Sequence, residues 1–272
     1  LNIASQIRSM ADLLRTVTSS DKRRNLLVML DSGPRSWDQI RDTLQVTSTG
    51  MLPQIKILMD KGLVRKEKYR YCLTDIGQTV AHSLVPLVRV TDVFDTLEGY
   101  LPDHDYSVLP ASFRHCIGDI AGVRVTEVET AEVFEPHQTL IDNLANAQLV
   151  FGIVPVLYPS HSTFFIDLAR GGMEVSIVMT RLIFNRVRDE SLDELNEGLK
   201  LPNLHLYVSD EDIRFGCIAT DTYLWLSLYT KSGIYDPKKG LISHEPSARQ
   251  WGEQLVRYYQ DRSLKVIQDQ VP

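Results

Sequence analysis

Residues 36–77 read SWDQIRDTLQVTSTGMLPQIKILMDKGLVRKEKYRYCLTDIG. Two amphipathic helices are predicted at the start of this stretch, because apolar residues recur every three or four positions: Trp37, Ile40 and Leu44, then Met51, Ile55, Leu58 and Met59. Thr47 or Ser48 offers the N-cap of the second helix, and Gly62 its C-cap. The pattern therefore predicts two helices joined by a short turn.

A charged hairpin is predicted directly after the second helix. Leu63 and Val64 begin a strand, residues 65–70 (RKEKYR) form a basic tip, and residues 71–73 return. Thr74 then caps another helix. This order is typical of a winged helix-turn-helix, whose second helix enters the DNA major groove while the hairpin, or wing, contacts phosphates. The alternative is a small helical domain with a solvated charge run.

The second helix of this motif is expected to begin near Thr49, because proline is poorly tolerated beyond the first turn and Pro53 follows soon after. Gln54 is suited to reading adenine, and Ser48 or Thr49 to holding phosphate. The remaining expected DNA contacts are cations of the helices and the hairpin: Lys22, Arg23, Arg35, Lys56, Lys66, Lys68 and Arg70.

Charge is divided unevenly along the chain. Of its 272 residues, with a net charge of −6, the first 90 hold 14 Lys and Arg against 8 Asp and Glu. Residues 91–272 hold 15 Lys and Arg against 27 Asp and Glu. The first 90 residues therefore have a net charge of +6, and the remainder has a net charge of −12. The division favours a front that faces phosphate and a rear that does not.

Composition excludes several classes of protein. The three cysteines (Cys72, Cys116 and Cys217) form no CxxC pair, and they are expected to be reduced, buried thiols of a cytoplasmic protein. No run is long and apolar enough for a membrane span, and the first residues read as an amphipathic helix rather than a signal peptide. The seven histidines are scattered, and Walker and Rossmann glycine patterns are absent, so no metal site or cofactor is expected.

The predicted layout is multidomain, with α followed by α/β structure. It comprises an N-terminal helix (1–20), a winged helix-turn-helix (21–76), a linker or dimerisation helix (77–104) and an α/β domain (105–272). The apolar stripe of the first helix fits packing on its own chain as well as a dimer contact. Pro86 is expected to kink or split the linker helix. Half-sites repeat one DNA turn apart, so a homodimer is expected.

The rear of the chain alternates strand and helix patterns. Strands are predicted at 123–128, 148–154, 172–178, 204–208, 213–219 and 222–229. Helices are predicted at 107–117, 136–147, 160–169, 189–199 and 247–262.

Four rear segments resemble a known family: HQTLIDNLANAQLVFGIVP (137–155), GGMEVSIVMT (171–180), YVSDEDIRFGCIATD (207–221) and DPKKGLISHEPSARQWGEQL (236–255). Behind a winged helix, they resemble archaeal transcriptional regulators of the methanogenesis-regulator (Fil regulator) type. The resemblance implies a cytosolic regulator that binds double-stranded DNA and carries an effector or partner domain behind the reader.

The rear domain also resembles half of a phospholipase-D-type fold, as in TrmB-like regulators. The family's His-x-Lys-x4-Asp pattern falls on Arg214, Gly216 and Asp221, so only the aspartate is kept. A guanidinium stays protonated and cannot act as the nucleophile. The resemblance therefore implies a degenerate fold without catalysis, in which Arg214 and Asp221 face each other across a pocket for an anionic or polar effector.

Two further ligand candidates follow predicted strands, at an edge where open α/β sheets bind ligands. His161 precedes Ser162 and Thr163, which serve equally as helix caps. Thr180 and Arg181 suit a carboxylate or phosphate, unless Arg181 pairs with Asp210 or Glu211. The chain is thus expected to be a dimeric, effector-responsive DNA-binding regulator and not an enzyme. The alternatives are a phosphodiesterase-like enzyme and a winged-helix protein-interaction scaffold.

Overall fold

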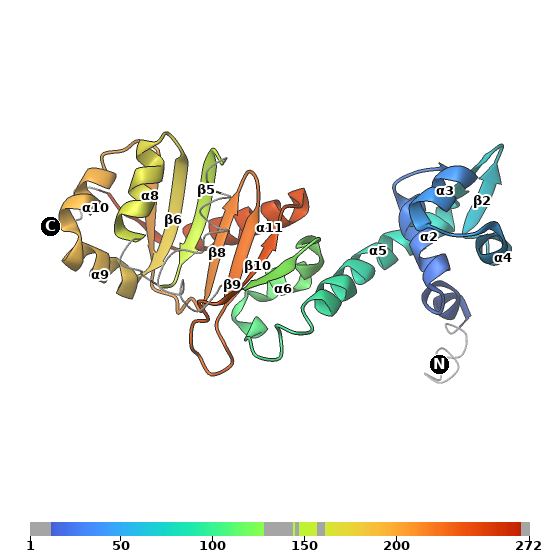
Figure 1. Ribbon diagram of the computed structural model, residues 1–272, viewed down its shortest axis with the longest axis horizontal. Helices are drawn as coiled ribbons and strands as arrows, with labels where there is room; N and C mark the ends of the chain where they lie inside the picture. The colour runs from blue at the N-terminus through green and yellow to red at the C-terminus, as the bar shows by residue number, and fades with distance from the viewer. Residues whose placement is uncertain (1–11, 128–143, 145–146, 157–160, 268–272) are drawn as a thin grey trace. The chain divides into compact units, whose positions relative to one another are not determined.

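The computed structural model of the chain describes residues 12–127, 144, 147–156 and 161–267 (Figure 1). Its contacts divide the chain into two compact units, Leu1–Val88 and Arg89–Pro272, called here the front unit and the rear unit. Helix and strand are mixed in the chain, as the sequence predicted. No helix within the described ranges is long and apolar enough to cross a membrane.

The front unit holds the elements predicted from the opening stretch. Residues 12–18 are helical and precede α2 (Asp21–Asp31), β1 (Arg35–Ser36), α3 (Trp37–Leu44), α4 (Ser48–Asp60), β2 (Val64–Glu67), β3 (Arg70–Leu73) and the start of α5 (Asp75–Thr96). The three strands form a small antiparallel sheet in the order β1-β3-β2. The hairpin is longer in strand than expected, since Arg65 to Glu67 and Arg70 belong to the strands and the turn is Lys68–Tyr69.

Local capping explains where α3 and α4 begin. Ser36 and Gln39 form a capping box at α3, and the Thr47 side chain accepts a hydrogen bond from the Gly50 N–H at α4. α4 begins at Ser48, close to the expected start near Thr49, and Pro53 is its sixth residue. The helix continues through it, because the buried side chains on the inner face of α4 hold both halves against the core.

Helix α5 contributes to both units. Ala81 and Leu84 are buried in the front core, whereas Val93, together with Leu97 just after the helix, is buried in the rear core. The helix runs unbroken past Pro86, so the expected split is absent. The segment predicted as a linker or dimerisation helix, 77–104, is therefore packed in a core at each end.

The rear unit is built on an eight-stranded sheet in the order β11-β7-β6-β5-β8-β9-β10-β4. Its strands are β4 (Arg124–Glu127), β5 (Leu149–Val154), β6 (Glu174–Thr180), β7 (Leu204–Ser209), β8 (Phe215–Thr220), β9 (Leu224–Leu228), β10 (Lys239–Ser243) and β11 (Leu264–Lys265). β5, β6 and β7 are parallel, and the other pairings are antiparallel. The predicted parallel strand at 148–154 is confirmed.

Helices cover the two faces of this sheet. One core joins the sheet to the end of α5, α11 (Pro246–Gln260) and the short helices η1 (Tyr106–Val108), α6 (Ala111–His115) and η2 (Ile117–Asp119). The other core joins it to α8 (His161–Arg170), α9 (Arg181–Glu190) and α10 (Leu192–Gly198), which gather beside β6 in Figure 1. Both faces are thus buried, as expected of parallel strands.

Several rear elements differ from the predictions. The single helix predicted at 189–199 corresponds to α10 alone. A second helix, α9, was not predicted; it precedes α10 and buries Ile183, Phe184 and Val187. β10 and β11 were not predicted, being short and without clear alternation. The predicted helix at 136–147 lies almost wholly outside the described residues. Cys116 is exposed, against the expectation that all three thiols are buried; Cys72 and Cys217 are buried as expected.

Candidate nucleic-acid interface

Helix α4 buries one face and exposes the other. Met51, Ile55 and Leu58 are at most 2% exposed and pack against α2 and the hairpin. At about 100° per residue, the opposite side carries Thr49, Pro53 and Lys56. All three are exposed, as is Ser48 at the first position of the helix. The outward side of α4 is therefore available to a partner.

Arg23 connects three helices in the front unit. Its Nε donates to the Thr16 carbonyl at 2.5 Å, Nη1 donates to Gln54 Oε1 at 2.7 Å, and Nη2 donates to Ser19 Oγ at 2.9 Å. The guanidinium is thus occupied within the chain. Gln54 is half-buried on the side of α4 that faces α2, and its acceptor atom is used. The bidentate adenine contact expected of Gln54 needs that same atom.

Lys22 and Arg35 lie in different surroundings from Arg23. Lys22 is exposed, and its Nζ lies 3.5 Å from the Gly50 carbonyl in the first turn of α4. Its charge therefore stands beside the start of the candidate reading helix. Arg35 is half-buried; its Nη2 donates to Ser32 Oγ at 2.9 Å, while its buried Nε has no partner among the described residues. Lys22 is the better placed of the two for a phosphate.

The cations of the hairpin lie on both of its faces. Val64 pairs with Leu73 and Lys66 with Tyr71, so Lys66 shares the core-facing side and lies 5.4 Å from the Tyr71 ring centre. Arg65 and Glu67 point to the other side and form an ion pair at 2.8 Å. Arg70 shares that second side because alternate residues of a strand share a face. Lys68 is in the turn.

Within the described part of the chain, Lys56, Lys68 and Arg70 make no ion pair, and all three are exposed. These charges are therefore free to neutralise phosphates. Because Lys66 and Arg70 occupy opposite sides of the hairpin, they are placed to meet different phosphates rather than to clamp the same one.

The structure does not bring Arg214 and Asp221 together. They flank the two ends of β8, a separation of about 20 Å at roughly 3.3 Å per residue. Arg214 is bound by Asp212 at 2.6 Å, which raises the Arg214 pKa, and Asp221 accepts a hydrogen bond from the Gln148 N–H. The expected pocket between them is therefore wrong, because the strand predicted at 213–219, present as β8, separates the two residues along its length.

Thr180 and Arg181 start helix α9 at the end of β6. The Thr180 hydroxyl caps α9 by accepting from the Ile183 N–H, and Arg181 donates to both carboxylate oxygens of Asp210, at 2.9 and 3.3 Å. This ion pair lowers the Asp210 pKa and is largely exposed. The pairing is the alternative that the sequence offered for Arg181. His161 is the first residue of α8, and its side chain lies outside the described part.

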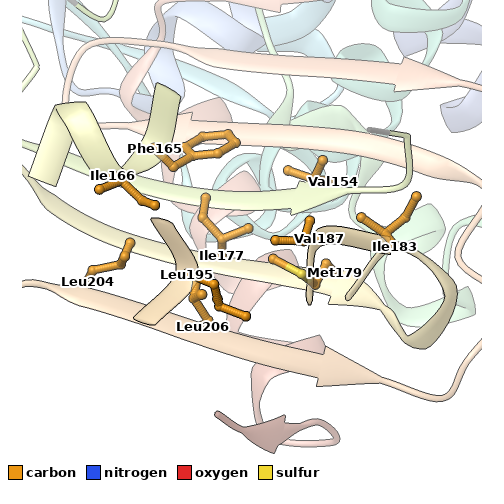
Figure 2. Close-up of a pocket in the computed structure, with 10 residues that line it drawn as sticks. All are labelled: Val154, Phe165, Ile166, Ile177, Met179, Ile183, Val187, Leu195, Leu204 and Leu206. Atoms are coloured by element: carbon orange, nitrogen blue, oxygen red, sulfur yellow. The ribbon is translucent and has the colours of Figure 1, made fainter. Parts of the chain in front are cut away.

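The second rear core contains an apolar cavity of about 40 Å³ (Figure 2). β5, β6 and β7 form its floor through residues such as Ile177, Met179 and Leu206, and α8, α9 and α10 cover it through Ile166, Val187 and Leu195. By comparison, an engineered apolar cavity that binds benzene in another protein has a volume of roughly 150 Å³. The cavity has no polar lining residue, so it suits neither an anion nor a sugar.

A buried histidine that sequence reasoning missed fastens the end of the α5 region to the sheet. His104 is 2% exposed, stacks on Tyr100 at 3.6 Å, and its two ring nitrogens lie 2.8 Å from the Tyr100 carbonyl and 3.1 Å from Asp236 Oδ2. The Tyr100 hydroxyl in turn accepts from the Leu228 N–H, and burial raises the Tyr100 pKa. The only sequence signal was an isolated histidine in an apparent linker.

Comparison with known families accounts for most of the chain. The model of the N-terminal domain of the methanogenesis regulatory protein FilR1 matches residues 11–92, and that of its middle domain matches residues 133–262. The chain belongs to the FilR1 family. The N-terminal model matches mainly the front unit, and the middle-domain model matches part of the rear unit. The resemblance stated from the four rear segments is thus confirmed.

A relative of this FilR1-family chain is the methanogenesis regulatory protein FilR1 of Methanothrix harundinacea (strain 6Ac), 26% identical over 263 residues. The alignment covers 95% of this chain and 59% of the relative, so the chain spans about three fifths of that protein's length.

Two solved structures show weaker similarity. TrmBL2, described as an archaeal chromatin protein with a novel mode of DNA binding, has a TM-score of 0.43 and 12% identity, covering 95% of this chain and 99% of its own. Nuc of Salmonella typhimurium, a phospholipase D family member, has a TM-score of 0.41 and 11% identity, covering 54% of this chain and 98% of its own. Neither similarity is strong enough to support a conclusion about this chain.

The contacts of Arg23 and Lys22 predict that removing the Arg23 side chain destabilises the front unit, whereas removing the Lys22 side chain does not. Arg23→Ala should lower the free energy of unfolding of the front unit by about 1–3 kcal/mol, because three acceptors lose their donor. Lys22→Ala should leave stability within about 0.5 kcal/mol, because Lys22 is exposed. Urea unfolding followed by circular dichroism measures both. An unchanged midpoint in Arg23→Ala contradicts the structural role of that residue.

Proposed function

We propose that this FilR1-family chain is a DNA-binding transcriptional regulator whose α4 enters the major groove. The observation that carries the proposal is the free outward face of α4, with exposed cations on three sides: Lys22 at its start, Lys56 on the face itself, and the β2–β3 hairpin beside it. The hairpin acts as the wing on phosphate, because the cations Lys66, Lys68 and Arg70 displace condensed counterions there.

Not all expected DNA contacts keep the same role in this proposal. Thr49 and Lys56 lie on the outward face and reach base edges, and Ser48 and Lys22 lie at the start of α4 and reach phosphate. Arg23 and Gln54 hold α4 against α2, and we assign them a positioning role. Arg35 lies in the β1 strand with one nitrogen held by Ser32, and it has no assigned contact.

The wing on phosphate predicts a measurable salt dependence. Affinity for DNA of the chain's own promoter region should fall steeply with salt, and Lys66→Ala/Lys68→Ala/Arg70→Ala should lose about two to three units of the log–log slope. Fluorescence anisotropy across a salt series measures the slope. A matched control removes three cations of the rear unit: Lys200→Ala/Lys231→Ala/Lys265→Ala should keep the wild-type slope. Equal slopes in the wild type and both triple variants contradict phosphate contact by the hairpin.

Dimeric binding is the second element of the proposal. A single α4 covers one half-site, and two readers on one face of DNA repeat about 10 base pairs apart. Inserting about 5 base pairs between the half-sites turns them to opposite sides of the duplex, so affinity should fall at least roughly tenfold. If the insertion leaves the affinity unchanged, the chain binds DNA as a monomer and the dimer proposal fails.

A small anionic effector bound by the rear unit is the third element. Thr180 and Arg181 lie at the ends of parallel strands, and the Arg181–Asp210 pair is exposed enough that an incoming anion displaces Asp210 at little cost. Such a ligand regulates only if it binds two arrangements of the readers with different affinity.

The effector proposal predicts that Arg181→Ala abolishes a response that the wild type shows. DNA affinity should shift when the anionic fraction of cell-extract metabolites is added to the wild type, and should stay fixed in Arg181→Ala. Arg170→Ala is the matched control, since Arg170 is another half-exposed arginine in ion pairs of the rear unit. A response that survives in Arg181→Ala, or is absent from the wild type, rejects this site. No described contact favours the phosphodiesterase alternative, because Arg214 and Asp221 lie apart.

A further inference from the structure

Exposed apolar side chains lie on and beside the outward face of α4. Leu52 is 44% exposed and Ile57 is 36% exposed, and Pro53 lies between them in the chain, exposed and directly opposite the buried face. Leu52 and Pro53 are the fifth and sixth residues of the helix. The N-terminal part of a reading helix is the part that contacts base edges. Beside Thr49 and Lys56, hydrocarbon side chains therefore occupy part of the surface where base-reading groups are expected.

The side chains that read bases in bidentate fashion are scarce on this face. Arg, Lys, Asn and Gln make those contacts. Of these, α4 contains only Gln54 and Lys56, and the Gln54 acceptor is held by Arg23 at 2.7 Å. Lys56 is one charged donor a turn beyond Leu52. In the proposed complex, α4 thus has few side chains near Leu52 and Pro53 that can form bidentate hydrogen bonds with bases.

The major groove offers one apolar group, the 5-methyl of thymine. We propose that Leu52 and Pro53 contact thymine methyl groups, so that the chain selects DNA carrying thymine at those positions. This inference rests on the proposed function, since it requires α4 to lie in the major groove. Lys22 and Lys56 flank the apolar patch with positive charge, which favours a nucleic acid over an apolar protein surface as its occupant.

The energetic contribution is sufficient for specificity. Burying one methyl group is worth a factor of about four in affinity. Replacing thymine by uracil removes that methyl and leaves base pairing and all phosphates unchanged, so the counterion-release contribution to binding is the same.

The test compares the full chain on two duplexes of its own promoter sequence, one with thymidine and one with 2′-deoxyuridine throughout. Wild type should bind the thymidine duplex more tightly by about fourfold per contacted methyl. Leu52→Ala should lose most of this ratio. Met59→Ala is the matched control: Met59 is 40% exposed on the same side of α4, two turns further from its start, and the ratio should remain at the wild-type value.

The outcomes separate the two proposals. Salt-dependent binding of both duplexes with equal affinity overturns methyl reading and leaves the DNA-binding function intact. Binding of neither duplex at low salt overturns the proposed function itself. A full ratio in Leu52→Ala assigns the discrimination to duplex deformability and overturns the role of Leu52.

Discussion

Helix α5 is buried in two cores, and the organisation of the chain depends on this. Ala81 and Leu84 of this helix are buried in the front core and Val93 is buried in the rear core, so side chains of one helix belong to both cores. Immediately after α5, the Tyr100 hydroxyl and the His104 ring tie the chain to β9 and to Asp236. The chain that follows α5 is therefore fixed within the rear unit at several points.

In the front unit, Arg23, which the sequence suggested as a DNA contact, instead forms hydrogen bonds within the chain. Arg23 uses its guanidinium to hold the helix of residues 12–18, its own helix and Gln54 of α4. Buried or half-buried polar groups require partners, and satisfying them fixes the orientation of the helix that carries them. Exposed residues of α4 that remain for contact with a partner include Thr49, Leu52, Pro53 and Lys56, which have few hydrogen-bonding groups.

The rear unit combines a sheet that has a hydrophobic core on each face with ion pairs at one edge. Arg181 is held by Asp210 and Arg214 by Asp212, so both cations with a suggested ligand role are compensated within the chain. The Cys217 thiol is buried, and burial raises its pKa, so it contributes packing rather than a nucleophile. The apolar cavity beneath α8–α10 is lined only by hydrocarbon and thioether groups.

The sequence by itself determined the local elements of the front unit. Apolar spacing and capping residues located α3, α4 and the hairpin, because helix and strand periodicity and N-cap hydrogen bonds depend on residues within a few positions of each other. It also identified the parallel strands β5 and β6 from their continuous apolar runs. Only the tertiary structure decided that Gln54 is engaged by Arg23, 31 positions away, and that Arg214 and Asp221 are separated by β8. Such pairings depend on how distant segments pack, and the chemistry of a residue type does not reveal its partner.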